Sequence, residues 1–184
     1  MRVIAGTLKG RQLAAPTWPG LRPTSDKLRE TLFNIVAARV DGARVLDGFA
    51  GTGALGIEAL SRGAAHVTFV ERDRRAQALI ARNLSRCGIR DGYAIIRGSL
   101  ARALTSLRGA SFDLVLLDPP YDEDAGEPIA IAGRHLASGG LLILEHARRS
   151  GTPAAAGGLV RTRQVISGDS ALSMYEAGPA APDV

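Results

Sequence analysis

The chain has very little cysteine and few aromatic residues. Among its 184 residues, Cys87 is the single cysteine, and phenylalanine, tryptophan and tyrosine together make up 4%. One cysteine excludes an intramolecular disulfide and any metal site built from several cysteines. The histidines His66, His135 and His146 are far apart and lack the spacing of metal ligands. We therefore expect no metal, and we interpret Cys87 as a packing residue near the end of a helix.

Long hydrophobic runs are also missing from this sequence. No apolar stretch approaches the roughly 20 residues that a membrane-spanning helix requires. The apolar part of residues 1–6 is too short for a signal peptide. Yet 46% of the residues are hydrophobic, and a chain of this length can form one domain with a sizeable core. The composition predicts a globular protein of the cytoplasm with no membrane partner. We also expect a monomer, although no feature of the sequence determines the oligomeric state.

Basic charge is concentrated near the N-terminus. The formal net charge is +5, and residues 1–30 hold six basic and two acidic side chains. A local basic segment is typical of proteins that contact a phosphate backbone. The segment could equally be a solvated arm in a chain whose basic residues are nearly all arginine. Charge alone leaves both interpretations open.

Strand and helix signals alternate from residue 44 onward. Short apolar runs predict strands at 45–46, 66–70, 93–97, 112–117 and 141–144. The segments between and after them predict helices at 54–62, 73–86, 100–107 and 127–137. Repeated βα units are typical of an α/β fold with a doubly wound, mostly parallel sheet. Residues 160–166 and 171–176 predict a closing antiparallel hairpin.

An N-terminal extension is expected before this domain. Weak alternation over residues 2–14 predicts a short hairpin, and Thr24 or Ser25 is expected to cap a following helix. We divide the chain into an N-terminal hairpin and helix at 1–40, which we expect to contact RNA, a main domain at 41–176 and a disordered tail at 177–184.

A glycine-rich loop follows the first strand of the main domain. Gly51, Gly53 and Gly56 form the pattern G-x-G-x-x-G, and Glu71 follows at the distance typical of an acid that binds ribose hydroxyls. NAD and S-adenosylmethionine both contain such a ribose, so the pattern alone also fits an NAD-dependent oxidoreductase. Asp47 ends the strand, where a carboxylate repels a pyrophosphate but attracts a sulfonium and an ammonium group. The loop therefore favours S-adenosylmethionine.

The segment Asp118-Pro119-Pro120-Tyr121 follows the apolar strand at 112–117. Because proline lacks an N–H, the Asp118 carboxylate and the Pro119 carbonyl form a stiff set of acceptors, with an aromatic ring nearby for stacking. Such a set suits the exocyclic amine of a nucleobase and has no use in hydride transfer. The same residues would also suit a simple turn at the end of a core strand.

With both motifs described, the chain resembles the RsmD family of 16S ribosomal RNA guanine-N2 methyltransferases over nearly its whole length. The resemblance rests on residues 2–6, 20–34, 47–63, 118–121 and 168–175, of which 20–34 is the most specific. It implies a Rossmann-like S-adenosylmethionine-dependent methyltransferase fold, S-adenosylmethionine as cofactor, and ribosomal RNA as partner, free or in an assembled small-subunit particle. The residues of the two motifs also fit an adenine-N6 methyltransferase, and the basic segment also fits a catalytically silent RNA-binding protein.

The motifs and the resemblance together predict three sets of site residues. The catalytic residues are Asp118, Pro119 and Tyr121. The cofactor residues are Asp47, Phe49, Ala50, Gly51, Gly53, Glu71, Arg72, Ser99 and Asp118. Ser99 is included because Gly98-Ser99 stands where many relatives of the wider superfamily place an acid for the adenine amine. The residues expected to reach RNA phosphates are Arg22, Thr24, Lys27 and Arg29, unless their helix only covers the cofactor pocket.

Overall fold

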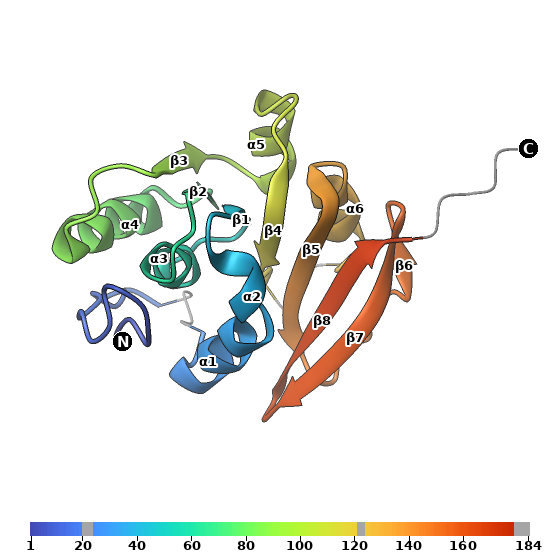
Figure 1. The fold of residues 1–184 in the computed structure, drawn as a ribbon, viewed down its shortest axis with the longest axis horizontal. Coiled ribbons are helices and arrows are strands. Elements are labelled where there is room, and N and C mark those ends of the chain that lie inside the picture. The colour runs from blue at the N-terminus through green and yellow to red at the C-terminus, as the bar shows by residue number, and fades with distance from the viewer. Residues whose placement is uncertain (20–23, 121–123, 179–184) are drawn as a thin grey trace, which may run out of the picture.

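A single mixed sheet forms the centre of the molecule (Figure 1). The structure is a computed structural model that describes residues 1–19, 24–120 and 124–178. Within these residues the sheet has eight strands in the order β3-β2-β1-β4-β5-β8-β7-β6. The parallel strands are β1 (Arg44–Asp47), β2 (His66–Glu71), β3 (Tyr93–Arg97), β4 (Phe112–Leu117) and β5 (Leu136–Ala147). The antiparallel edge consists of β6 (Ala155–Ala156), β7 (Leu159–Ser167) and β8 (Ser170–Ala177).

Helices cover both faces of the sheet, which confirms the predicted doubly wound α/β fold. One face packs against α1 (Asp26–Ile35), α3 (Ala54–Ser61) and α4 (Arg74–Cys87), and the other against α5 (Leu100–Ser106) and α6 (Gly126–Gly133). The short α2 (Ala37–Val40) leads from α1 toward β1. The strand order reverses between β1 and β4, and ligands of such sheets bind at this switch point.

The element boundaries differ from the sequence-based ones in a few places. The strand predicted at 141–144 extends over 136–147, because a register shift lets Leu136 pair with Phe112 before regular pairing begins at Leu141. The preceding helix therefore ends at Gly133 rather than at residue 137. The two-residue β6 is too short to produce a periodic signal. The predicted hairpin over 2–14 is reduced to one bridge between Arg2 and Gln12.

The N-terminal residues pack into the same core as the sheet. Glu58 on α3 is completely buried and accepts hydrogen bonds from the backbone N–H groups of Ile4 at 2.8 Å and Ala5 at 3.0 Å. Asn83 on α4, also buried, bonds both the N–H and the carbonyl of Ala14. The side chain of Val3 joins the core beneath α1 and α3. These contacts hold the start of the chain against α3 and α4. None of the described helices is long and apolar enough to cross a membrane.

Candidate active site

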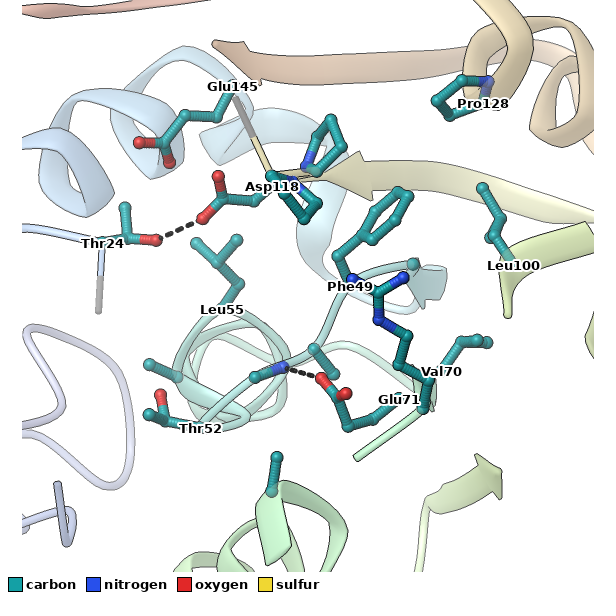
Figure 2. A pocket seen from close by; sticks show the side chains of 18 of the residues that line it. Thr24, Phe49, Thr52, Leu55, Val70, Glu71, Leu100, Asp118, Pro128 and Glu145 are labelled. Atoms are coloured by element: carbon teal, nitrogen blue, oxygen red, sulfur yellow. Dashed lines mark hydrogen bonds between the residues drawn. The ribbon is translucent and has the colours of Figure 1, made fainter. Parts of the chain in front are cut away.

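A pocket of about 1070 Å³ opens at the carboxyl ends of the parallel strands. Its wall contains the loop after β1, the ends of β2 and β4, the start of α5, part of β5 and the first turn of α1 (Figure 2). Of the predicted cofactor residues, seven line it: Phe49, Ala50, Gly51, Glu71, Arg72, Ser99 and Asp118. The structure thus brings the glycine loop and the Asp-Pro-Pro segment to one cavity.

Four acidic side chains leave neighbouring strands on the same face of the sheet. They are Asp47 at the end of β1, Glu71 at the end of β2, Asp118 directly after β4, and Glu145 in β5. Side chains alternate along a strand, and the residue two positions before each of these points into the core beneath α1, α3 and α4. The strand ends therefore concentrate negative charge, which favours a cationic cofactor and an amine substrate.

Asp47 holds the first turn of α3 against the end of β1. Its side chain is 1% exposed, and one carboxylate oxygen accepts a hydrogen bond from the N–H of Gly56 at 3.0 Å. Burial raises the pKa of Asp47 to about 7, the bond from Gly56 opposes this, and repulsion from Asp118 and Glu71 adds to it. Asp47 is not among the described pocket-lining residues. It would therefore act on a ligand through its charge rather than by contact.

Glu71 connects the glycine loop to β2. One of its carboxylate oxygens accepts from the N–H of Gly51 at 2.8 Å (Figure 2). The other accepts from the N–H of Asp73 at 2.8 Å. Each oxygen has room for a further hydrogen bond. Gly51 has φ 53° and Gly53 has φ 76°, a left-handed conformation that glycine adopts without strain. Gly53 caps α3 and packs toward Ile80 rather than lining the pocket.

Asp118 is held by a residue from the start of the chain. The Thr24 hydroxyl donates to one Asp118 carboxylate oxygen at 3.0 Å (Figure 2). Burial raises the pKa of Asp118 to about 6, and the hydrogen bond from Thr24 opposes that rise. We predicted from the sequence that Thr24 contacts RNA phosphates, but its hydroxyl faces the carboxylate that we predicted to be catalytic. Pro119 and Pro120 line the pocket beside it.

The prediction that Arg29 contacts RNA phosphates is wrong. Its side chain is 0% exposed, and one guanidinium nitrogen donates to the carbonyl of Arg2 and to the carboxylate of Asp26, each at 2.7 Å. Arg29 lies on the inner face of α1 with the buried Leu28 and Leu32, so it anchors the helix to the N-terminal residues.

The remaining residues of the three predicted sets fall in different places. Lys27 is exposed and lines the pocket. Arg22 and Tyr121 lie outside the described residues. Ser99 lines the pocket as the N-cap of α5, where its hydroxyl accepts from the N–H of Arg102 at 3.4 Å.

Sequence reasoning missed Glu145 and Trp18. Glu145 is 4% exposed and lies within a run of apolar residues in β5, yet it lines the same pocket as Asp118. An isolated acid in an apolar strand was the available signal, because burying a carboxylate is costly. Trp18 also lines the pocket, and its ring centre lies 5.2 Å from the guanidinium carbon of Arg75.

The sheet order, the glycine loop at the switch point and the Asp-Pro-Pro segment beside it define a protein with the fold of S-adenosylmethionine-dependent methyltransferases. Residues 1–176 match the family model described as "Conserved hypothetical protein 95". The chain belongs to this family, the RsmD family.

Known relatives match the chain over nearly its full length. It is 36% identical over 179 residues to the Ribosomal RNA small subunit methyltransferase D of Escherichia coli K12, covering 96% of this chain and 89% of the relative. It is 38% identical over 181 residues to the Bacillus subtilis protein YlbH, covering 96% and 98%. The solved structure of Escherichia coli yhhF is similar with a TM-score of 0.81 at 34% identity, covering 96% of this chain and 97% of that one.

Proposed function

We propose that this protein transfers a methyl group from S-adenosylmethionine to the N2 amine of one guanine in 16S ribosomal RNA. The observation that carries the proposal is the shared pocket, in which the Asp118 carboxylate and the Pro119 residue face the glycine loop. The name of the Escherichia coli relative supports small-subunit ribosomal RNA as the substrate.

The pocket residues fit S-adenosylmethionine. Glu71 lies at the end of β2 with both carboxylate oxygens able to accept a further bond, as the ribose hydroxyls of an adenosine require. The acidic strand ends suit the positive charges of the methionine part, whereas a pyrophosphate would be repelled. When bound, S-adenosylmethionine supplies an electrophilic methyl group next to the amine.

Asp118 and Pro119 prepare the amine for transfer. The N2 lone pair of guanine is delocalised into the ring, so the amine is a poor nucleophile. Two acceptors, the Asp118 carboxylate and the Pro119 carbonyl, hold its two N–H bonds and favour a pyramidal nitrogen. Catalysis then rests on positioning and electrostatic stabilisation, with no covalent enzyme intermediate. Asp118 afterwards accepts the proton of the methylated amine.

The substrate base has to leave its stack to reach Asp118, which is half-buried in the pocket wall. Lys27 is exposed beside Thr24, and we assign it to a neighbouring phosphate of the RNA. Stacking of Tyr121 on the base remains our proposal for that residue.

Mapping of the methylated nucleotide tests this function. The purified protein is incubated with labelled S-adenosylmethionine and either free 16S RNA or small subunits, and the modified nucleoside is identified by mass spectrometry. We expect N2-methylguanosine at one position. Label in N6-methyladenosine, or label in no nucleoside of either substrate, would contradict the proposal.

A further inference from the structure

The carboxylates of Asp118 and Glu145 occupy adjacent positions on neighbouring parallel strands. Leu117 of β4 pairs with Leu144 of β5, so Asp118 and Glu145 follow at the next position of the same register. Both side chains line the pocket, and Figure 2 shows both pointing toward Thr24. On its other side, Glu145 is paired with the buried Leu172 of β8.

Such a pair of acceptors distinguishes guanine from adenine. In guanine the N2 amine is adjacent to an N1–H, so that edge presents donors at two neighbouring atoms. In adenine the N6 amine is adjacent to an unprotonated N1, which is an acceptor. A single acidic pocket residue at Asp118 would bind either amine. A second carboxylate beside it favours the base with a donor at N1 and repels the base with a lone pair there.

We propose that Glu145 determines the choice of guanine by accepting the N1–H of the base. This inference rests on the proposed function, in which Asp118 and Pro119 accept the two N–H bonds of the N2 amine. Thr24 occupies one oxygen of Asp118, and the other oxygen is the one we assign to the amine. Glu145 then contacts the same base edge, one strand further along the sheet.

A bound guanine would also offset part of the cost of a carboxylate at this buried position. Glu145 is 4% exposed, and the four residues that precede it in β5 are apolar. Burial of a carboxylate is costly, and hydrogen-bond donors offset that cost. The N1–H of a bound guanine adds such a donor, and its binding would be strengthened by the low dielectric of the pocket.

Two RNA substrates that differ at one base test the inference. One carries guanine at the methylated position, and the other carries 2-aminopurine, which has the same amine but an unprotonated N1. Single-turnover methyl transfer is measured for the wild type, for Glu145→Gln and for Glu127→Gln. Glu127 is a matched control, because it also lines the pocket but is exposed and lies on α6.

We expect the wild type and Glu127→Gln to prefer guanine by about 10- to 100-fold, the scale of one hydrogen bond to a charged group. In Glu145→Gln this preference should fall toward one, because the amide can donate to the unprotonated N1 as readily as it can accept from N1–H. The loss of O6 in 2-aminopurine affects all three proteins alike, so the change between variants reports on N1.

Equal rates of methyl transfer to the two RNAs by the wild type would overturn the inference, whatever the variants show. An undiminished preference in a Glu145→Gln protein that binds S-adenosylmethionine normally would also overturn it. Neither result affects the proposed function, because guanine would still be methylated at N2. If the wild type methylates a different atom or base, the proposed function fails and this inference fails with it.

Discussion

Replacing Thr24 with valine removes one hydroxyl from the proposed active site and little else. The two side chains have nearly the same shape, so the first turn of α1 should be preserved. The lost contact is the 3.0 Å hydrogen bond from the Thr24 hydroxyl to the Asp118 carboxylate. Because a hydroxyl donor stabilises the charged form of a carboxylate, its removal raises the pKa of Asp118.

The size of the change follows from the strength of that bond. Burial already raises the pKa of Asp118 to about 6, and the hydrogen bond from Thr24 is the opposing contribution. A hydrogen bond to a charged group contributes roughly 1.5 kcal/mol or somewhat more, which corresponds to about one pH unit. The active form of Asp118 is the ionised one. Activity should therefore be lost on the acid side, and this acid limb should move upward by about one pH unit in Thr24→Val.

The assay is kcat/KM for the RNA substrate at saturating S-adenosylmethionine, measured across the pH range around 6. This parameter reports the ionisation of the enzyme–cofactor complex before RNA binds. Thr24→Ser, which keeps the hydroxyl, is the matched control and should retain the wild-type profile. A Thr24→Val protein with lower activity at every pH but an unmoved acid limb would refute the reasoning.

Three further predictions concern the cofactor, the fold and the RNA. Glu71→Ala should weaken S-adenosylmethionine binding by roughly 1.5–3 kcal/mol, the scale of lost charge-assisted hydrogen bonds, and unchanged affinity by calorimetry would place the ribose elsewhere. The raised pKa of Asp47, about 7, means that its burial costs stability as pH rises from about 4 through 7. Asp47→Asn should therefore raise the free energy of unfolding of the cofactor-free protein, measured with urea, by on the order of 3 kcal/mol at about pH 8 and not at all below about pH 4. An equal increase at both pH values would refute burial of the Asp47 charge as the cause. Lys27→Ala should lower the slope of log affinity for RNA against log salt concentration by somewhat under about one unit. Lys9 is an exposed control residue outside the pocket wall, and Lys9→Ala should change this slope less than Lys27→Ala does.

The sequence was sufficient to predict the fold, and two segments that it singled out, the glycine loop and the Asp-Pro-Pro segment, line one pocket. Strand β4 could be recognised because the apolar residues 114–117 are followed by a carboxylate and two prolines, and a parallel sheet brings that position to the pocket edge. The glycine loop was predictable for a similar reason, since its turn requires residues that adopt positive φ.

The errors arose where a side chain's role depends on tertiary contacts. Arg29 looks like one more basic residue of a basic segment, and only the packing of α1 shows that it points inward to the carbonyl of Arg2. Thr24 and Asp118 meet across 94 positions of the sequence, a contact that no local pattern encodes. To predict that Glu145 lines the pocket, one must know the register between β4 and β5, because a shift of one residue would place its side chain on the opposite face of the sheet.

The central claim is that Asp118 acts on the amine of the substrate, and Asp118→Asn tests it most directly. Asparagine preserves the size of the side chain but cannot carry the negative charge. In single-turnover reactions with 16S RNA, we expect the rate of N2-methylguanosine formation to fall by about two orders of magnitude or more, the scale of losing one electrostatic contact to the transition state. The affinity for S-adenosylmethionine, measured by calorimetry on the same protein, should fall much less than the transfer rate. A near-normal transfer rate in Asp118→Asn would contradict the account.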